Sequence, residues 1–539
     1  MSILKNSVRY AVAVALAGTA ASAANALSIS TYAANASTNV NVYISGSTAL
    51  DGTLTNAAIQ TASGQPGMCQ SGTTDIYLIG TVQKLIYCSA TAASGLNAGT
   101  PLAIFKESAV GSANGVQPLI NVAKGGSAGT SFINPAVITD ATCGTPATTT
   151  ATGDFGTYVT HPTCATNATI AGTPTGGFAD VEASILQTAA GAPISGTDAS
   201  TFLTATPTLD QVWGLPVTKA LYYALQTAEG LTSTCPANFT VYGSVVTGTS
   251  FLGKDSPSCA PSLSKQQVAS LLTQQIATGT QLGIPNSTDD TIYICRRDFG
   301  SGTEASFEAY FVGERCSITS LVVPGEDGFT VWANGSTGGV RTCLQAFQVG
   351  GKTLTGFYAT TSTINTVGGQ YAVGFMNTEV TAANLSGAGD AFRMVAIDGV
   401  LPQISNVQNG TWPYFSTGNS FQIKAGKPGA PSGSALTAFN AITTKIGHPI
   451  WTADSNTNYS KNPWGTAGDV SPAGLYAASN TPTLPASHTT ASSNPTNAFT
   501  KTAGGSINNC DQPVFDSAHI TTVAAPVESV LLGTGTVNN

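Results

Sequence analysis

The hydrophobic positions of this chain alternate between short apolar runs and longer stretches with helical spacing. Residues 40–44 (VNVYI) and 291–295 (TIYIC) are rich in β-branched and aromatic side chains and predict strands. Residues 262–278 place apolar side chains at helical spacing behind Ser264, a candidate N-cap, and residues 304–312 have a helical pattern as well. Strands that alternate with helices in this way indicate stacked α/β layers rather than an all-β sandwich.

Two segments lose this periodicity. Residues 119–175 are rich in Thr, Ala, Gly and Pro and contain Cys143 and Cys164, so we expect a disulfide-tied surface insertion there. Residues 454–510 are again polar and nearly aperiodic, and Cys510 stands at their end. We expect this second segment to be a long loop or decoration on the folded body.

The first 26 residues have the pattern of a signal peptide. Lys5 and Arg9 precede an apolar run over residues 10–17, and small residues at 21–26 offer cleavage sites. We therefore expect a secreted protein, periplasmic or extracellular, whose mature chain begins near residue 24 or 27. No later run approaches the roughly 18 apolar residues that a membrane-spanning helix needs, so no transmembrane segment is expected in the mature chain.

The charge composition limits the partners. The chain has 19 Lys and Arg against 27 Asp and Glu, and only 9% of its residues are charged. Such a chain has no basic field that would attract nucleic acid or an anionic membrane surface. We expect neither as a partner.

The ten cysteines are an even number in a chain with a predicted export signal, which favours disulfide bonds. The sequence leaves their connectivity open. Pairing neighbours along the chain gives Cys69–Cys88, Cys143–Cys164, Cys235–Cys259, Cys295–Cys316 and Cys343–Cys510. No metal site or cofactor is expected, because no CxxC motif occurs and the four histidines are scattered without ligand spacing, at positions 161, 448, 488 and 519.

The segment Thr291–Cys316 carries the clearest candidate chemistry. Two arginines and a Gly-Ser-Gly-Thr turn stand between the predicted strand and the predicted helix. Gly302 lets the backbone approach a ligand closely, and a helix N-terminus presents free N–H groups. Arg297 adds a planar, two-pronged charged donor, while Ser301 and Thr303 add hydroxyl donors. The alternative is an ordinary strand-to-helix turn with a Ser or Thr N-cap.

Two further turns of small residues follow predicted strands. Ser47, Thr48 and Ala49 come directly after the first strand, and Ser112 lies in a glycine-flanked turn after another. Both turns have the same potential to hold an anion. Asp180 ends a short predicted strand, where an acid caps a turn or helix more often than it contacts a ligand.

In this order the turns resemble those of the phosphate-binding proteins of ABC transporters, members of the type 2 periplasmic-binding-protein fold, and their secreted relatives. Four motifs carry the resemblance: Gly46–Thr48, Gly111–Gly115, Ala179–Asp180 and Arg297–Thr303. The resemblance covers about 38–118 and 176–425, and extends to the predicted helix at 435–446. Two departures stand out, since Ala49 replaces the family's usual Phe and the loop reads RDFGSGT instead of RSDGSGT.

The resemblance implies a two-lobed α/β fold of the type 2 periplasmic-binding-protein kind, with irregular disulfide-tied insertions. Lobe one would combine residues 27–205 with 385–539, and lobe two would span residues 206–384. Phosphate would bind between the lobes to Ser47, Thr48, Ala49, Ser112, Asp180, Arg297, Ser301, Gly302 and Thr303. An ionised Asp180 would accept a hydrogen bond from protonated phosphate and repel sulfate, which carries no proton near neutral pH.

We therefore expect a secreted substrate-binding protein that captures inorganic phosphate in an interlobe cleft. An ABC transporter permease and cell-surface components are its candidate partners. Two other classes stay open: an extracellular or surface-associated structural or adhesive protein built on the same fold, and a secreted phosphatase. A phosphatase would need metal ligands or an activated nucleophile, and no histidine lies near the serine loops in the sequence.

Overall fold

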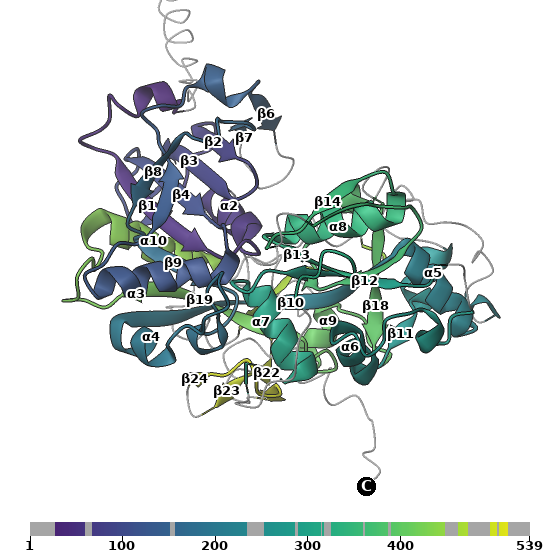
Figure 1. Cartoon of the computed structure of the whole chain (residues 1–539). Helices are drawn as coiled ribbons and strands as arrows, with labels where there is room; N and C mark the ends of the chain where they lie inside the picture. Colours follow the sequence, from purple (N-terminus) through teal and green to yellow (C-terminus); the bar gives the residue numbers. More distant parts are fainter. Residues whose placement is uncertain are drawn as a thin grey trace, which may run out of the picture.

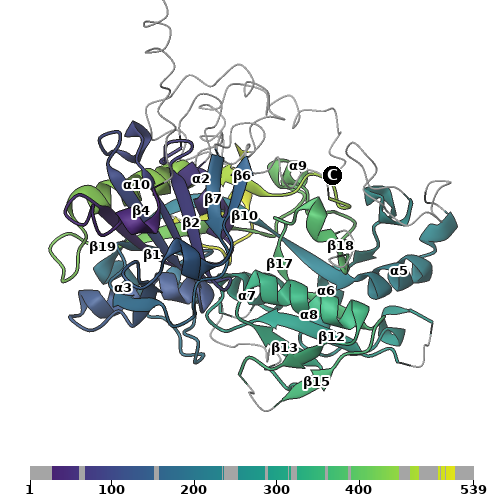
Figure 2. The same cartoon turned by 90° about the horizontal axis from the view of Figure 1, so that it is seen from above.

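The computed structural model of the chain describes residues 27–59, 67–150, 157–233, 235, 253–285, 289–313, 315–316, 325–358, 362–385, 390–447, 462–472, 496–497, 499–503 and 506–515. The expected signal peptide and most of the expected decoration at 454–510 lie outside these ranges. The described residues form two groups of strands and helices that lie side by side, lobe one at the upper left of Figure 1 and lobe two at the right. Figure 2 shows the same division from above.

Lobe one is built on a mixed sheet. Its strands pair in the order β6 (Ala147–Thr150), β7 (Thr157–His161), β2 (Thr74–Ile79), β3 (Gln83–Ser89), β4 (Pro101–Glu107), β1 (Val40–Gly46), β9 (Gly176–Ala179), β19 (Phe415–Ile423), β10 (Leu203–Thr218) and β20 (Asp469–Pro472). Its helices are α2 (Asp51–Ile59), α3 (Gln117–Ala123), α4 (Gly196–Phe202) and α10 (Gly433–Ile446).

Both faces of this sheet are covered, which explains the continuous apolar runs in its strands. In β4, Leu102 and Ile104 pack in the cluster that contains α2 and α10. The alternate residues Ala103 and Phe105 pack on the opposite face, together with Phe132 of the expected insertion. Two strands of the insertion, β5 (Thr130–Ile133) and β8 (Thr169–Gly172), pair with each other, and β6 and β7 extend the main sheet. The segment expected to be irregular therefore contains four strands.

Lobe two contains a second group of paired strands. Their order is β11 (Ser262–Leu263), β18 (Phe392–Ile397), the last residues of β10, β16 (Tyr371–Gly374), β12 (Ile292–Arg297) and β13 (Val331–Asn334). Its helices are α5 (Lys219–Ala228), α6 (Lys265–Leu272), α7 (Gly302–Phe307), α8 (Thr337–Val349) and α9 (Ile404–Gln408). The helical pattern predicted for 304–312 is present, with α7 continuing as a π-helical turn, Glu308–Val312.

The remaining strands are short. They are β14 (Thr353–Thr355), β15 (Thr363–Asn365), β17 (Met376–Asn377), β21 (Thr496–Asn497), β22 (Phe499–Thr500), β23 (Thr502–Ala503), β24 (Ser506–Ile507) and β25 (Val514–Phe515).

The long strand β10 joins the two lobes. From Leu203 to Val212 it pairs with β19, and from Leu215 to Thr218 it pairs with β18. The strand β18 therefore lies in the second sheet, although the sequence-based division assigned everything from residue 385 to lobe one. Nothing in the local periodicity of a sequence marks which sheet a strand joins. We propose that the chain returns to lobe one between β18 and β19.

All ten cysteines form disulfide bonds, and three of the five pairings are as expected: Cys69–Cys88, Cys143–Cys164 and Cys235–Cys259. The other two expected pairings are wrong, because Cys295 bonds to Cys343 and Cys316 bonds to Cys510. The side chains of Cys295 on β12 and Cys343 on α8 are buried in one cluster, since α8 packs against β12. Pairing by position along the chain overlooks such helix-to-strand packing.

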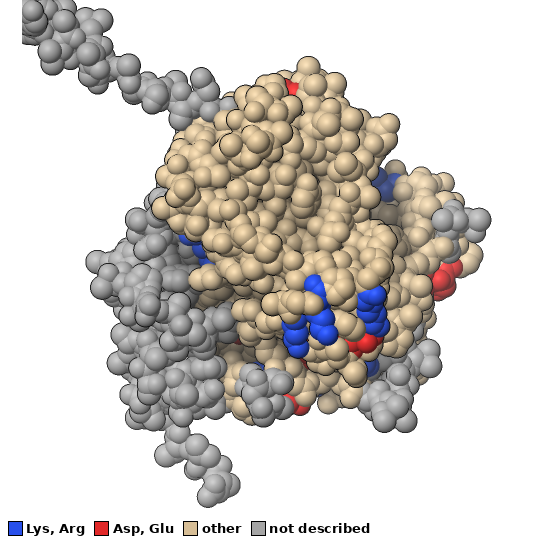
Figure 3. Space-filling model, turned by 90° about the vertical axis from the view of Figure 1, so that its left-hand side faces the viewer, with Lys and Arg blue, Asp and Glu red and all other residues tan. Residues whose placement is uncertain are grey.

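Within the described ranges, no helix combines the length and the apolar content needed to cross a membrane. The outer side of lobe one, drawn in Figure 3, is almost free of charged side chains, and the Lys and Arg atoms on it gather mainly in one small group. This agrees with the absence of a broad basic field in the composition.

Candidate functional site

Four loops from the two lobes meet where the lobes touch. Strand β1 lies between β4 and β9 and runs parallel to both. Because the carboxyl ends of parallel strands meet at one edge of a sheet, the segments that follow these strands are neighbours. They are the β1 loop (46–50), the β4 loop (Gly111–Gly115, a 3₁₀ turn) and the turn at Asp180. Lobe two contributes the β12 loop (298–303), which leads into α7.

Asp180 is the centre of the hydrogen bonds in this region. The Ser47 hydroxyl donates to its Oδ1, Thr303 Oγ1 lies 3.4 Å from its Oδ2, and its own N–H donates to Ser112 Oγ at 3.0 Å. These residues and Arg297 are at most 2% exposed. Burial raises the pKa of the Asp180 carboxyl, while the Ser47 hydroxyl and the Arg297 guanidinium oppose the rise. The Asp180 carboxyl and the Arg297 guanidinium thus interact electrostatically where the lobes touch, while the ion pair that Arg297 forms is with Asp298, 3.7 Å from its Nη2.

Arg297 is held by the segment that leads into α8. Its Nε donates to Asn334 O at 3.1 Å, its Nη2 to Gly335 O at 3.3 Å, and its Nη1 to Thr337 Oγ1 at 3.4 Å. Three of the five N–H groups of a guanidinium are used in these bonds, so the side chain is fixed in direction. Because these bonds hold the long side chain in one conformation, its positive charge stays within electrostatic reach of Asp180.

Glycines let the loops of the two lobes touch. A Cβ atom at Gly302 would lie 2.4 Å from Ser112 Oγ and 2.8 Å from the Cβ of Asp180, so only glycine fits there. Nearby, the Ala113 N–H donates to Gly300 O at 2.8 Å and joins the two lobes by a backbone hydrogen bond. The glycines of the motif, which the sequence suggested would admit a ligand, admit the opposite loop in this structure.

The other predicted residues have different surroundings. Ser301 Oγ accepts a hydrogen bond from the Glu304 N–H at 3.3 Å, so the N-cap interpretation is correct for this hydroxyl. Thr48 is half-buried, and its hydroxyl makes no hydrogen bond to any described residue. Ala49 is buried in the cluster that contains Trp213 of lobe two. The structure thus brings all nine predicted residues to the contact between the lobes, though not all onto one point.

Arg296 faces away from Asp180, as the alternation of side chains along β12 predicts. Its Nη2 lies 2.9 Å from Glu304 Oε1 and 3.2 Å from Glu308 Oε1, and its guanidinium is 5.1 Å from the ring centre of Phe299. Burial raises the pKa of Glu304 to about 7, against the attraction of Arg296. This buried cluster holds α7 to the strand before it.

Lys106 is a residue that sequence analysis missed. It is 2% exposed, donates to Gly46 O and to Ser47 O (3.1 Å), and forms an ion pair of 2.9 Å with Asp51. Ser47 has a φ of 23°, in the left-handed region that non-glycine residues seldom adopt. Lys106 holds the β1 loop in that conformation. The available signal was a lysine at the end of an otherwise apolar strand.

Two further buried acids, Glu379 and Asp469, lie near Asp180. Thr53 Oγ1 of α2 lies 3.2 Å from Glu379 Oε1 and 3.4 Å from Asp469 Oδ2. Burial raises the pKa of both acids, and the charge of Asp180 raises both further. Like charges this close disfavour the ionised form of each other. Asp469 belongs to β20, which pairs with β10, so part of the expected decoration is built into the lobe contact.

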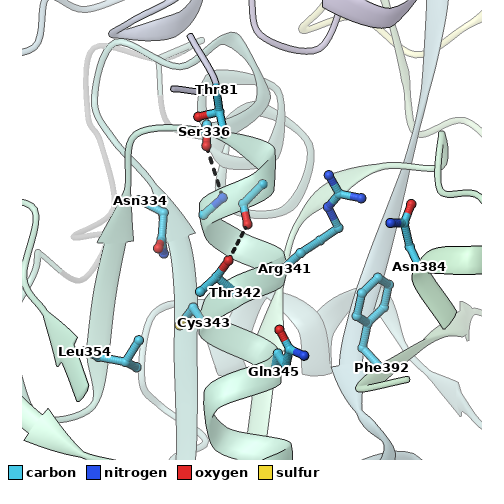
Figure 4. A pocket seen from close by; sticks show the side chains of 12 residues that line it. Thr81, Asn334, Ser336, Arg341, Thr342, Cys343, Gln345, Leu354, Asn384 and Phe392 are labelled. Atoms are coloured by element: carbon cyan, nitrogen blue, oxygen red, sulfur yellow. Dashed lines mark hydrogen bonds between the residues drawn. The ribbon is translucent and has the colours of Figure 1, made fainter. Parts of the chain in front are cut away.

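A cavity of about 570 Å³ opens beside these loops, at the start of α8. Its lining comes from both lobes, with Thr81 from lobe one facing Ser336 and the first turns of α8 (Figure 4). Asn334 lines the cavity and also holds Arg297 through its carbonyl. None of the nine predicted residues lines this cavity, so it is a neighbour of the candidate site and not the site itself.

The described fold is therefore α/β, with a large mixed sheet and a buried, polar contact between two lobes. No family model and no curated protein matches the sequence. Among solved structures, the chain is similar to a putative phosphate ABC transporter substrate-binding protein with bound phosphate from Clostridium perfringens, at 14% identity and a TM-score of 0.35, covering 77% of this chain and 97% of that one.

Two other solved structures are similar to the chain. One is a high affinity periplasmic phosphate-binding protein (PfluDING) bound with phosphate, at 13% identity and a TM-score of 0.34, covering 79% of this chain and 91% of that one. The other is an ABC-type phosphate transport receptor from Vibrio cholerae, at 14% identity and a TM-score of 0.25, covering 50% and 72%.

Proposed function

We propose that this chain is a secreted binding protein that captures inorganic phosphate between its two lobes. The observation that carries the proposal is the burial of Asp180 and Arg297, one from each lobe and within electrostatic reach of each other, with the hydroxyls of Ser47, Ser112 and Thr303 in contact with Asp180. A guanidinium and several hydroxyls are the donors that bind an oxyanion. An ionised carboxyl in the same place accepts hydrogen bonds, and an oxyanion can donate one only if it carries a proton.

This requirement favours phosphate over sulfate. Phosphate keeps at least one proton near neutral pH and donates it to an ionised Asp180, whereas sulfate would place two anionic oxygens against each other. The Glu379 and Asp469 carboxyls nearby add to the selection, since further negative charge opposes a fully deprotonated anion.

Access to this site requires the lobes to move apart. Ser47, Ser112, Asp180, Arg297 and Thr303 are almost fully buried by the loops of the opposite lobe. We propose that the segments of β10 and β19 that link the lobes bend to open the site. Closing it again removes water from the anion and strengthens every charged hydrogen bond.

We propose binding without turnover. Among the described residues the one histidine, His161, lies on β7, and β2, β3 and β4 separate β7 from β1 in the sheet. The loops at the lobe contact supply hydroxyls and a guanidinium but no imidazole from this position. A signal peptide at 1–26, and a permease or cell-surface component as partner, complete the proposal.

The deciding experiment is isothermal titration of the purified mature protein with phosphate and with sulfate. We expect saturable phosphate binding with one site per chain and a sulfate affinity at least about 100-fold weaker. Arg341→Lys, on the neighbouring cavity, is the matched control and should bind like the wild type.

Other outcomes point to the other classes of protein. A folded, fully disulfide-bonded protein without phosphate binding would contradict the proposal and favour a structural or adhesive role. Hydrolysis of p-nitrophenyl phosphate that Asp180→Asn abolishes would contradict binding without turnover.

A further inference from the structure

Three ionisable side chains from separate parts of lobe one meet at the far end of its sheet. Asp75 lies on β2, His161 ends β7, and Asp140 begins the 3₁₀ turn Asp140–Cys143 of the insertion. In the parallel pairing of β2 with β7, His161 is opposite Tyr77, and Asp75 is two residues away on the same strand. Side chains two residues apart share one face of a strand, so Asp75 projects to the same side as Tyr77 and its partner His161. Asp140 reaches this side from its 3₁₀ turn.

The side chain of His161 has no hydrogen bond to any described residue. It is 2% exposed, and neither of its ring nitrogens has a hydrogen-bond partner. Its Nε2 faces the two acids, 3.6 Å from Asp75 Oδ2 and 3.9 Å from Asp140 Oδ1. The imidazole is fixed in this direction by the ring of Tyr77, which stacks on it at 4.3 Å with an angle of 8° between the planes.

The two carboxylates share one hydroxyl. Tyr77 OH lies 2.6 Å from Asp140 Oδ1 and 3.0 Å from Asp75 Oδ2, while it accepts a hydrogen bond from the Ile29 N–H at 2.9 Å. A tyrosine hydroxyl has a single proton, which serves only one of the two acids. Asp75 is buried and Asp140 is partly exposed, and two carboxylates that share one hydroxyl in this way favour a further positive centre between them.

The distances fit ligands of one ion. Both distances from His161 Nε2 to the carboxylate oxygens are longer than a good hydrogen bond. Two ligand atoms at about 2.0–2.2 Å from a common cation are roughly 3–4.3 Å apart, depending on the angle at the metal. One ligand atom from each of Asp75, Asp140 and His161 lies within 4.8 Å of the others.

We propose that Asp75, Asp140 and His161 bind one divalent transition-metal cation of the Zn²⁺ kind. Imidazole nitrogen together with carboxylate oxygen suits Zn²⁺ and its neighbours, whereas Ca²⁺ and Mg²⁺ prefer sets of six or more oxygen ligands. Asp140 is 41% exposed at its side chain, which gives the cation a route from solvent. Water would complete the coordination.

The role of this cation is to fasten the insertion to lobe one. Asp140 lies three residues before Cys143, whose disulfide to Cys164 closes the insertion, and the Cys164 N–H donates to Leu78 O of β2 at 2.8 Å. The cation adds a second link between the same parts, from the turn at Asp140 to β2 and β7. It is separate from the lobe contact and does not depend on the proposed phosphate site.

The test uses the mature protein, stripped of metal with EDTA and returned to metal-free buffer. Titration with Zn²⁺, followed by calorimetry and elemental analysis, should give one bound ion per chain and a higher melting temperature. His161→Gln and Asp140→Asn should each weaken Zn²⁺ binding by at least about tenfold. His488→Gln, a histidine outside the described residues, is the matched control and should bind Zn²⁺ like the wild type.

Each other result decides against the site. Absence of saturable Zn²⁺ binding would show that these three side chains do not form a cation site. Unchanged Zn²⁺ affinity in Asp140→Asn would overturn the ligand assignment. Because the Asp140 side chain is partly exposed, this variant should fold, so a loss of affinity would not be due to unfolding. Equal affinity for Mg²⁺ or Ca²⁺ would overturn the class of cation.

Discussion

The contact between the lobes and the cluster at His161 are two buried polar regions of different construction. At the lobe contact, the predicted site residues stand on loops at the ends of β1, β4, β9 and β12, and the two lobes bring them together. At the cluster, Asp75 and His161 stand on two paired strands of one sheet. In the proposed function the first arrangement opens and closes, whereas the second lies within one lobe. Substitutions in the first should change ligand affinity, and substitutions in the second should change the stability of one lobe.

The largest effect is expected at Gly302. Gly302→Ala places a Cβ 2.4 Å from Ser112 Oγ, so the lobes cannot close as they do here, and phosphate affinity should fall at least about 100-fold. Gly338→Ala, in the first turn of α8, is the matched control, since its Cβ would meet nothing nearer than 3.6 Å. Calorimetric titration compares the two variants. Equal affinities would show that binding does not need this closure.

Removing the charge of Asp180 should abolish selectivity. Asp180→Asn replaces an acceptor-only group with an amide that donates to either anion, so the preference for phosphate over sulfate should shrink from at least about 100-fold, roughly 2.7 kcal/mol, toward equality. Competition of sulfate with bound phosphate measures the ratio. Discrimination as sharp as in the wild type would mean that Asp180 only caps a turn.

Arg297→Lys should weaken phosphate binding by about 1–3 kcal/mol, because an ammonium group cannot reproduce two aligned N–H bonds. Arg296→Lys is the comparison on the other side of the same strand. Since Arg296 pairs with Glu304 and Glu308, the Arg296→Lys substitution should lower the urea midpoint of unfolding and leave phosphate affinity nearly unchanged. Equal losses of affinity in both variants would contradict the assignment of Arg297.

The smallest effect on phosphate affinity is expected at Glu107, next to Lys106 at the end of β4, where the change is in stability. Burial raises the pKa of Glu107 to about 7, although Lys106 and the Ala109 N–H oppose the rise. The folded protein then binds more protons than the unfolded chain between about pH 4.5 and 7, so the free energy of unfolding falls as pH rises through that window. Relative to Glu107→Gln, the wild type should lose about 2–3 kcal/mol across it.

Urea unfolding of both proteins at pH 4.5, 5.5 and 7 measures this difference. Phosphate affinity at a fixed pH should differ little between them, which separates the stability of the β4 loop from binding. Parallel stability curves would show that Glu107 ionises in the folded protein as it does in the unfolded chain.

The loops of the lobe contact were predictable because their signals are local. A strand, a turn of small residues and a helix N-cap follow one another within about a dozen residues, as around Ser47 and Ser301. Two of the five disulfide bonds were not predictable, because they depend on how α8 packs on β12 and where the C-terminal segment passes lobe two. The place of β18 has the same cause, since strand pairing over long sequence distances leaves no local pattern.

The ionisable clusters were hidden for a related reason. Asp75 and His161 are 86 positions apart along the chain and meet only because β2 and β7 pair, so spacing rules for metal ligands do not detect them. Glu379 and Asp469 likewise meet through separate partners of β10. Lys106 gave a weak signal as a charge at the end of an apolar strand, and its role follows only from the fold of the β1 loop.

The bond between Cys316 and Cys510 imposes an order on the maturation of this chain. It spans 194 residues, whereas Cys295 and Cys343 are only 48 apart. As the chain is synthesised, the shorter bond can form before Cys510 has been added, whereas the thiol of Cys316 has no native partner until then. During this interval Cys316 is open to exchange with the seven cysteines that precede it. We therefore expect formation of the native bonds to be faster when a catalyst of disulfide exchange is present.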